Sequence, residues 1–232
     1  MVGGYEMPVA NTTITNNYVK KNFIGVFLWF SINSTLVDND IENNTWGVGL
    51  VNCIWNNIKH NTISNNGVGI VMDFASQNDI DGNNITSNKP VGLIIDDSSL
   101  NKIHRNHIEG NEYGIDISES DNNKITDNTV RNSGLGISLA ASTSNIFYHN
   151  DFLNNTKQVD STSEYANVWD DGAEGNYWSN HNPPDEDKDK IGDTPYVIDE
   201  NNTDRHPLIY PYGYKPKPDV NDDGVVDIKD LY

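Results

Sequence analysis

Apolar and polar positions alternate along most of the chain in a pattern that repeats about every 22 residues. Each unit reads I-x-x-N-x-I-x-x-N, followed by a short spacer and G-I-x-L. Alternation with period two inside a short run is typical of a β-strand, and a fixed longer period indicates that such strands stack in a solenoid. The first apolar position of the unit is occupied by Ile14, Leu36, Ile58, Ile80, Ile103, Ile125 and Phe147.

Five further columns stay in phase with the first. Two are mainly asparagine, which can hydrogen-bond from one unit to the next and tolerates the left-handed turn: Asn17, Asn39, Asn61, Asn83, Asn106, Asn128 and Asn150, then Asn22, Asn44, Asn66, Asn88, Asn111, Ser133 and Asn155. One column is glycine, which indicates a positive φ or a backbone approach too close for a Cβ: Gly25, Gly47, Gly69, Gly92, Gly114 and Gly136. The two remaining columns are apolar and begin at Val19 and Val26.

These columns predict an all-β fold, a right-handed single-stranded parallel β-helix (solenoid) of about 7 rungs of 22 residues with a C-terminal capping segment. Left-handed β-helices have much shorter hexapeptide periods, and leucine-rich repeats need a Leu-rich signature that this chain lacks. Cys53 falls in a column of small residues and is expected to be a packed side chain. We assign residues 1–165 to the β-helix and 166–215, where the period is lost, to a cap with an acidic loop.

The N-terminal end of the repeat is incomplete. Gly4-Tyr5-Glu6-Met7 copies the G-I-x-L segment, so the chain begins partway round a rung. We therefore expect either further rungs upstream or end-to-end self-association.

Composition excludes several classes of function. The formal net charge is -19, which disfavours nucleic acid and anionic membranes as partners and favours cations. No apolar run is long enough to span a bilayer. With one cysteine, the chain has no internal disulfide framework.

Residues 216–232 have the chemistry of a calcium loop. Oxygen ligands at loop positions 1, 3, 5, 7, 9 and 12 come from Asp219, Asn221, Asp223, the Val225 carbonyl, Asp227 and Asp230, with Gly224 at the sharp turn. The segment resembles the first half of a type I dockerin, and this resemblance implies a cohesin-like partner for a complete dockerin. A weaker Ca²⁺ candidate is the acidic run Asp185, Asp187, Asp189, Ile191 and Asp193, in which Lys190 stands where glycine is expected.

The repeats resemble the right-handed parallel β-helix repeat family, including its NosD-like group of periplasmic proteins. Gly175-Asn176-Tyr177-Trp178-Ser179, the run Asp185 to Tyr196, and His206-Pro207-Leu208 resemble the tail of such proteins. The resemblance implies the fold and a location outside the cytoplasm, extracellular or at the cell surface. Members include carbohydrate-active enzymes and inert surface proteins. The six histidines form no spaced ligand motif that would support the copper association of the NosD name.

Two outward clusters are weak candidates for catalysis. Asp73 and Asp96 share a position on neighbouring rungs with Asp116 near them, which would suit calcium or sugar chemistry. Arg105, Asp127 and His149 share another column with His107 nearby, which would suit a lyase or epimerase acting on uronic acids. The alternative interpretation is that both are simply the polar surface of a solenoid.

The leading hypothesis is a non-catalytic extracellular scaffold or adhesion module with calcium-binding C-terminal loops. The alternatives are a polysaccharide-active enzyme, either a uronate lyase or an epimerase, and a carbohydrate-binding module that uses Trp46, Trp55 and Tyr113. Because several of these aromatic residues align with apolar columns, we expect them to pack in the core. Glycosylation sequons, which matter only in a host that glycosylates exported proteins, occur at Asn11, Asn33, Asn43, Asn84, Asn154 and Asn201.

Overall fold

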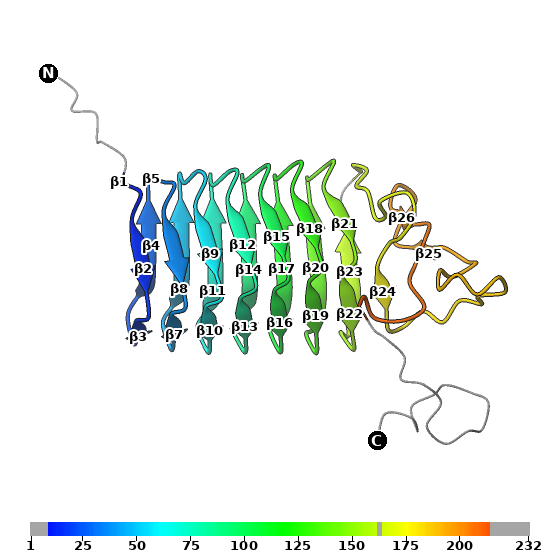
Figure 1. Cartoon of the computed structure of the whole chain (residues 1–232), viewed down its shortest axis with the longest axis horizontal. Coiled ribbons are helices and arrows are strands. Elements are labelled where there is room, and N and C mark those ends of the chain that lie inside the picture. Colours follow the sequence, from blue (N-terminus) through cyan, green and yellow to red (C-terminus); the bar gives the residue numbers. More distant parts are fainter. Residues whose placement is uncertain (1–8, 162–163, 214–232) are drawn as a thin grey trace, which may run out of the picture.

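The chain folds as a parallel β-helix whose coils succeed one another along a single axis (Figure 1). The structure is a computed structural model that describes residues 9–161 and 164–213. About eight turns of about 22 residues each form three parallel sheets. The described residues contain no helix and therefore no helix able to cross a membrane.

Each coil contributes one strand to each sheet. Sheet 1 contains β2 (Thr13–Thr15), β6 (Thr35–Val37), β9 (Asn57–Lys59), β12 (Asp79–Asp81), β15 (Lys102–His104), β18 (Lys124–Thr126) and β21 (Ile146–Tyr148). Sheet 2 contains β3 (Tyr18–Lys20), β7 (Asp40–Glu42), β10 (Thr62–Ser64), β13 (Asn84–Thr86), β16 (His107–Glu109), β19 (Thr129–Arg131), β22 (Asp151–Leu153) and β24 (Tyr177–Trp178). Sheet 3 contains β4 (Ile24–Trp29), β8 (Trp46–Val51), β11 (Val68–Asp73), β14 (Val91–Asp96), β17 (Tyr113–Ser118), β20 (Leu135–Ala140) and β23 (Lys157–Ser161).

Two short pairs complete the strands. β1 (Val9–Ala10) pairs in parallel with β5 (Ser31–Ile32), and β25 (Tyr196–Val197) pairs antiparallel with β26 (Thr203–Asp204) in the cap.

Equivalent residues of successive repeats lie directly over one another, which confirms the prediction made from the columns. Ile103, for example, is in register with Ile80 on one side and Ile125 on the other. All three are fully buried, so the apolar columns form one continuous core inside the coil. The small-residue column lies inside as well, and Cys53 within it is fully buried.

The asparagine columns form hydrogen-bonded ladders along the axis. Asn39 donates from both its backbone N–H and its side-chain amide to Oδ1 of Asn61, each at 3.0 Å. Asn61 donates in the same way to Asn83. A third ladder, which the column analysis did not identify, is formed by Asn56, Asn78, Asn101, Asn123, Asn145 and Asn167.

The glycine column exists because neighbouring backbones approach closely. A Cβ at Gly92 would lie 2.7 Å from the carbonyl oxygen of Gly114, and one at Gly69 would lie 2.4 Å from that of Gly92. None of the column glycines has a positive φ. Of the two physical reasons for a fixed glycine, close packing is therefore the correct one here.

The cap continues the core columns with aromatic rings. Phe147 stacks on Trp169 with ring centres 4.2 Å apart, and Phe152 stacks on Trp178 at 4.4 Å. Trp178 in turn stacks on Tyr196 at 4.2 Å. These rings cover the end of the coil that would otherwise expose apolar core.

The asparagine ladders also end in the cap. Asn150 donates to Asn176, and Asn176 donates to Oδ2 of the buried Asp204. Burial raises the pKa of Asp204 to about 6, although the N–H groups of Asn176, Trp178 and His206 favour its charged form.

Two aromatic residues expected in the core lie at the surface instead. Trp55 is 54% exposed and Tyr113 is 37% exposed. Tyr113 is the first residue of its strand and is in register with the buried Val91 and the half-buried Leu135. Trp55 lies in a turn at a φ of 58°, and Trp46 is half-buried, so the expectation was wrong for Trp55 and Tyr113.

Candidate functional site

The most distinctive chemistry on the surface lies on the outer side of sheet 1. The residues before and after the central apolar residue of each strand in this sheet point outward because side chains alternate along a strand. In the later coils they include Lys102 and His104 on β15, Lys124 and Thr126 on β18, and Tyr148 on β21.

Two adjoining hollows follow these side chains, and we call them together the groove. One, of about 240 Å³, is lined by Lys102, His104, Lys124, Thr126 and Asp127. The other, of about 440 Å³, is lined by Lys124, Ile146, Tyr148, Val168, Asp170, Asp171 and Gly172. Lys124 lines both, so the groove runs across successive coils toward the cap.

Lys102 and Lys124 place two positive charges in the groove, whose first hollow Asp127 also lines. They are in register on adjacent strands, and neither forms an ion pair within the described residues. Like charges placed opposite one another across a pair of strands are destabilising. In a chain of net charge -19, two such lysines side by side are suited to holding an anion.

The other charged residues on β9, β12 and β15, and Arg105 directly after β15, are paired with one another. Asp79 accepts from Lys59 at 2.9 Å and lies 2.7 Å from Nε2 of His104. Asp81 accepts two hydrogen bonds from Arg105, at 2.8 and 2.7 Å. Burial opposes the charge of Asp81, but the Arg105 hydrogen bonds and the nearby His104, Arg105 and Lys59 hold its pKa below the usual value.

The middle of the groove is aromatic and apolar. The Nζ atom of Lys124 lies 5.1 Å from the centre of the Tyr148 ring. Ile146 and Val168 lie beside Tyr148 in the same hollow and are joined by a β-bridge between the last coil and the cap. An aromatic ring with a cation over it and polar rims around it is suited to a sugar that carries a negative charge.

The second catalytic candidate cluster reaches into this groove, because its member Asp127 lines the first hollow. Arg105, Asp127 and His149 occupy one turn column with φ values of 55°, 58° and 57°. Arg105 is engaged by Asp81, as described above. His107 lies on sheet 2, where its Nε2 is 2.8 Å from the Glu109 carboxylate. It does not join the cluster.

His149 is packed rather than open. Its Nδ1 lies 3.8 Å from Asp127 and its Nε2 lies 2.8 Å from Glu174. Its ring stacks on Tyr212 with centres 3.8 Å apart, and its side chain is 13% exposed. The contacts of His149 therefore join the last coil to the cap.

The first catalytic candidate cluster lies on a different face, the outer side of sheet 3. Asp73 and Asp96 are in register, and Ser118 on the next coil donates to Asp96. Asp116 lies in a separate outward column, in register with Ile94. Burial, together with the charges of Asp96 and Asp97, raises the pKa of Asp73.

The acidic loop of the cap brings three carboxylates together. Ligand oxygens of Asp185, Asp187 and Asp189 all lie within 4.8 Å of one another. Asp185 also accepts the N–H groups of Asp189 and Lys190, and Asp189 accepts that of Ile191. Asp193 accepts from the N–H of Glu186. The other calcium candidate, residues 219–230, lies outside the described residues.

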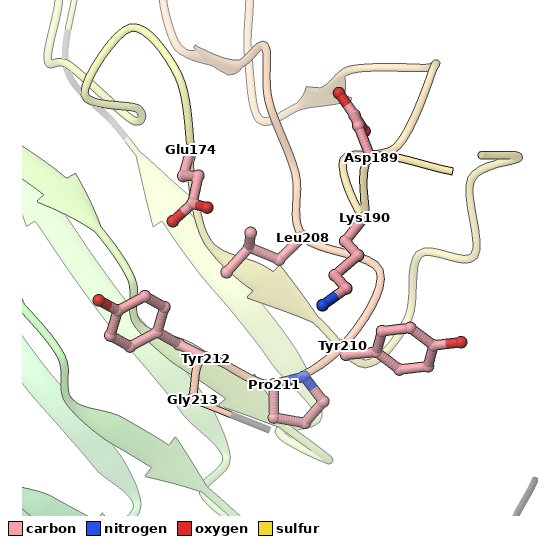
Figure 2. Close-up of a pocket in the computed structure, with 8 residues that line it drawn as sticks. All are labelled: Glu174, Asp189, Lys190, Leu208, Tyr210, Pro211, Tyr212 and Gly213. Atoms are coloured by element: carbon pink, nitrogen blue, oxygen red, sulfur yellow. The ribbon is translucent and has the colours of Figure 1, made fainter. Parts of the chain in front are cut away.

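A small hollow of about 140 Å³ separates this loop from the end of the described chain. Figure 2 shows Lys190 reaching into it toward Pro211, while the Asp189 carboxylate points away. The backbone N–H of Tyr212 donates to Asp151 on β22 at 2.7 Å and thereby fixes one wall of the hollow. Burial raises the pKa of Asp151 to about 6, and the Tyr212 hydrogen bond opposes this rise.

Sequence reasoning did not single out the groove, although part of its signal was present. Lys102 and Lys124 precede the first apolar residue of two consecutive repeats, and Tyr148 follows that residue in the next. The rest of the groove comes from residues 168–172 of the aperiodic cap, which no repeat pattern could place there.

Comparison with known proteins gives one family and a set of similar folds. The family model described as "Periplasmic copper-binding protein (NosD)" matches residues 3–183. No curated protein matches the chain. Among solved structures, the A-modules of the Azotobacter vinelandii mannuronan C-5 epimerases AlgE4 and AlgE6 align at 15% and 13% identity with TM-scores of 0.56 and 0.57.

Tailspike protein 2 of an Escherichia coli O157:H7 bacteriophage aligns at 15% identity with a TM-score of 0.61. The AlgE4 alignment covers 68% of this chain and 58% of that module, the AlgE6 alignment 68% and 57%, and the tailspike alignment 67% and 25%. The chain therefore spans less than two thirds of each of these structures. At these identities the likeness shows the fold alone.

The described residues do not fit the copper in the family description. Copper in proteins is held by imidazole and sulfur ligands. Within the described part of the chain, the only three metal-ligating side chains that come together are the carboxylates of Asp185, Asp187 and Asp189. Cys53 and Met72 are fully buried in the apolar core. Oxygen ligands of this kind suit calcium or magnesium instead.

Proposed function

Because this chain belongs to the NosD family and folds as a parallel β-helix, we propose that it is a non-catalytic scaffold or adhesion module, acting outside the cytoplasm, that binds an acidic polysaccharide along the groove. The observation that carries this proposal is the pair of in-register lysines, Lys102 and Lys124, without carboxylate partners within the described residues. A carboxylate placed between them would relieve their mutual repulsion.

The repeat of the fold supports a polymeric ligand. Stacked strands of a β-helix lie about 4.8 Å apart, close to the length of one hexopyranose unit in an extended chain. A polysaccharide that runs along the axis would therefore present about one sugar to each coil. Tyr148, one coil beyond Lys124, lies where the next sugar ring would stack.

The test is binding of the full chain to hyaluronan, with neutral dextran as the control polymer. We expect binding to hyaluronan that weakens as salt is added, because the attraction is between charges. The double variant Lys102→Gln/Lys124→Gln should bind about tenfold or more weakly. The matched control Lys89→Gln/Lys157→Gln makes the same change of charge away from the groove and should bind as the wild type does. Unchanged binding in the first variant would refute the proposal.

A polysaccharide-active enzyme is the second candidate, and one contact favours it. Lys124 lies over the Tyr148 ring, so a sugar whose carboxylate is held by the lysine would lie beside the tyrosine, whose hydroxyl would be available as an acid or base. His149 is less suited to the role of base because Glu174 and Tyr212 occupy its surroundings. Turnover of uronic-acid polymers, with and without calcium, that disappears in Tyr148→Phe would replace the non-catalytic proposal with this one.

Calcium binding also forms part of the proposal. We propose that Ca²⁺ binds the Asp185–Asp189 carboxylates and the loop at residues 219–230, whose sequence matches a calcium loop. A cohesin-like partner would follow for a protein that carries the complete dockerin, and end-to-end self-association remains a proposal from the sequence.

A further inference from the structure

We propose that two copies of this chain associate side by side through an aromatic surface on their first three coils. We call this surface the aromatic face. It covers the outer side of sheet 3 and the turns between sheets 3 and 1, and its rings belong to Phe27, Trp29, Phe30, Trp55 and Phe74. The groove lies on sheet 1 in the later coils, so this inference is independent of the polysaccharide proposal.

The aromatic face is large enough for a contact between two copies. Its rings are between 44% and 56% exposed. Half-buried aliphatic side chains join them, since Trp29 is in register with Val51 and Ile32 forms a β-bridge with Ile54. A fully buried ring covers about 150–250 Å², so five half-exposed rings offer on the order of 500 Å². Two copies would bury on the order of 1,000 Å² of aromatic surface alone, which is the lower limit for a specific interface.

The aromatic face is almost free of charged residues, although the net charge of the chain is -19. Residues 22–34 and 43–57 include no Asp, Glu, Lys or Arg, and residues 65–78 include only Asp73. The equivalent residues 111–123 of a later coil include four acidic side chains. Depletion of charge together with enrichment in aromatic residues is typical of the buried centre of a protein interface. Two copies can therefore meet here without bringing like charges together.

Three of the rings stand at positions where the backbone favours a small polar residue. Phe30, Trp55 and Phe74 have φ values of 49°, 58° and 48°. A bulky side chain is unfavourable in this left-handed region, which asparagine tolerates well. The same turn columns hold Asn52 and Asn33, at φ values of 52° and 51°. The turns themselves therefore do not explain the aromatic residues, whereas a contact made outside the chain does.

The rings are staggered in a way that fits a second copy of the same face. Phe30 and Phe74 share one turn column with Asn52 between them, whereas Trp55 stands in the other column. Two coils separate Phe30 from Phe74 by about 10 Å, so a ring of the partner could stack about 5 Å from each. Within the described residues, Trp55 and Phe74 stack on no other ring. In a two-fold contact each copy supplies both the rings and the gaps that receive them.

Sedimentation equilibrium of the full chain tests the proposal. We expect twice the chain mass of 25.9 kDa at protein concentrations of about 10–100 μM. Because both copies carry a negative net charge, added salt should tighten the dimer by screening their repulsion. The test variant is Trp55→Asn/Phe74→Asn, produced in a host that does not glycosylate. Asparagine already occupies both turn columns, so the circular dichroism spectrum should be unchanged, whereas the dissociation constant of the dimer should rise about a hundredfold or more.

The matched control is Tyr165→Asn/Val197→Thr, which removes apolar side chains that are 54% and 65% exposed in the cap and should dimerise as the wild type does. Both residues of the test variant lie beyond the first coil, so a dimer joined through the open N-terminal end would survive the change. Survival of the dimer in that variant would therefore refute the proposal, as would a dimer that weakens when salt is added. A wild type that stays monomeric up to about 100 μM would also overturn it and would leave the aromatic face to a different partner.

Discussion

At the scale of single residues, the buried asparagines hold the coils in register. Asn83 accepts two hydrogen bonds from Asn61, each at 3.0 Å, and donates to the Ile58 carbonyl at 2.8 Å and to Asn106 at 3.0 Å. Its side chain is therefore fully satisfied in a place without access to water. A buried amide that lost these partners would leave several polar groups of its neighbours unpaired.

We therefore expect Asn83→Ala to lower the free energy of unfolding by about 3–5 kcal/mol, since each buried group left unpaired costs about 1–3 kcal/mol. Urea denaturation followed by circular dichroism measures the change. The matched control is Asn84→Ala, one residue further along, whose side chain is exposed and should matter little. Equal stability of the two variants would show that the ladder does not stabilise the coil.

The buried Asp204 makes stability depend on pH in the direction opposite to ordinary acid unfolding. Its pKa is about 6 in the fold and near 3.8 in the unfolded chain, so protonation favours the folded state. The stabilising contribution is complete below about pH 4 and is lost as the pH rises through about 6. From about pH 5 to about pH 8 the wild type should lose on the order of 1 kcal/mol more stability than Asp204→Asn. If the free energies of unfolding of the two proteins changed with pH in the same way, this prediction would be contradicted.

At the scale of elements, the sequence predicts whatever recurs and misses what does not. Successive asparagines of the column from Asn17 to Asn150 are 22 or 23 residues apart, and the structure places them in one ladder. The same ladder continues from Asn150 to Asn176, a gap of 26 residues, and to Asp204 after another 28. Insertions in the cap hide these last steps from any periodic analysis. The third ladder, by contrast, follows the period and could have been found from Asn56, Asn78 and Asn101.

The acidic loop of the cap gives a prediction about a single element. We expect Ca²⁺ to raise the midpoint of thermal unfolding, because it would relieve the repulsion among Asp185, Asp187 and Asp189. A chelator should reverse the rise. The double variant Asp187→Asn/Asp189→Asn should show a smaller rise of the midpoint with Ca²⁺, because the contribution of this loop is lost. Asp223→Asn tests the contribution of the loop at residues 219–230 separately. An unchanged response in the first variant would mean that the loop is only a solvated turn.

At the scale of the whole molecule, the candidate groove exists because a periodic coil meets an aperiodic cap. The repeat explains why Lys102 and Lys124 are in register. It cannot explain why the turn containing Asp171 lines the same hollow as Tyr148, since this depends on how residues 168–172 fold over the last coil. The candidate site was therefore only half predictable from the sequence, whereas the coil itself was predictable almost in full.

The two ends of the coil differ in burial, and this difference predicts where unfolding begins. In the first coil Ile14 and Val19 are only partly buried, whereas their equivalents Ile125 and Val130 are fully buried. At the other end, Trp169 and Trp178 cover the last core residues. In a solenoid each coil is stabilised mainly by its neighbours, so opening should start at the less covered end and proceed along the axis. Hydrogen exchange followed by mass spectrometry should show protection that rises from β2–β4 to β18–β20. Faster exchange near β21–β22 than in β2–β4 would show instead that the cap is the weaker end.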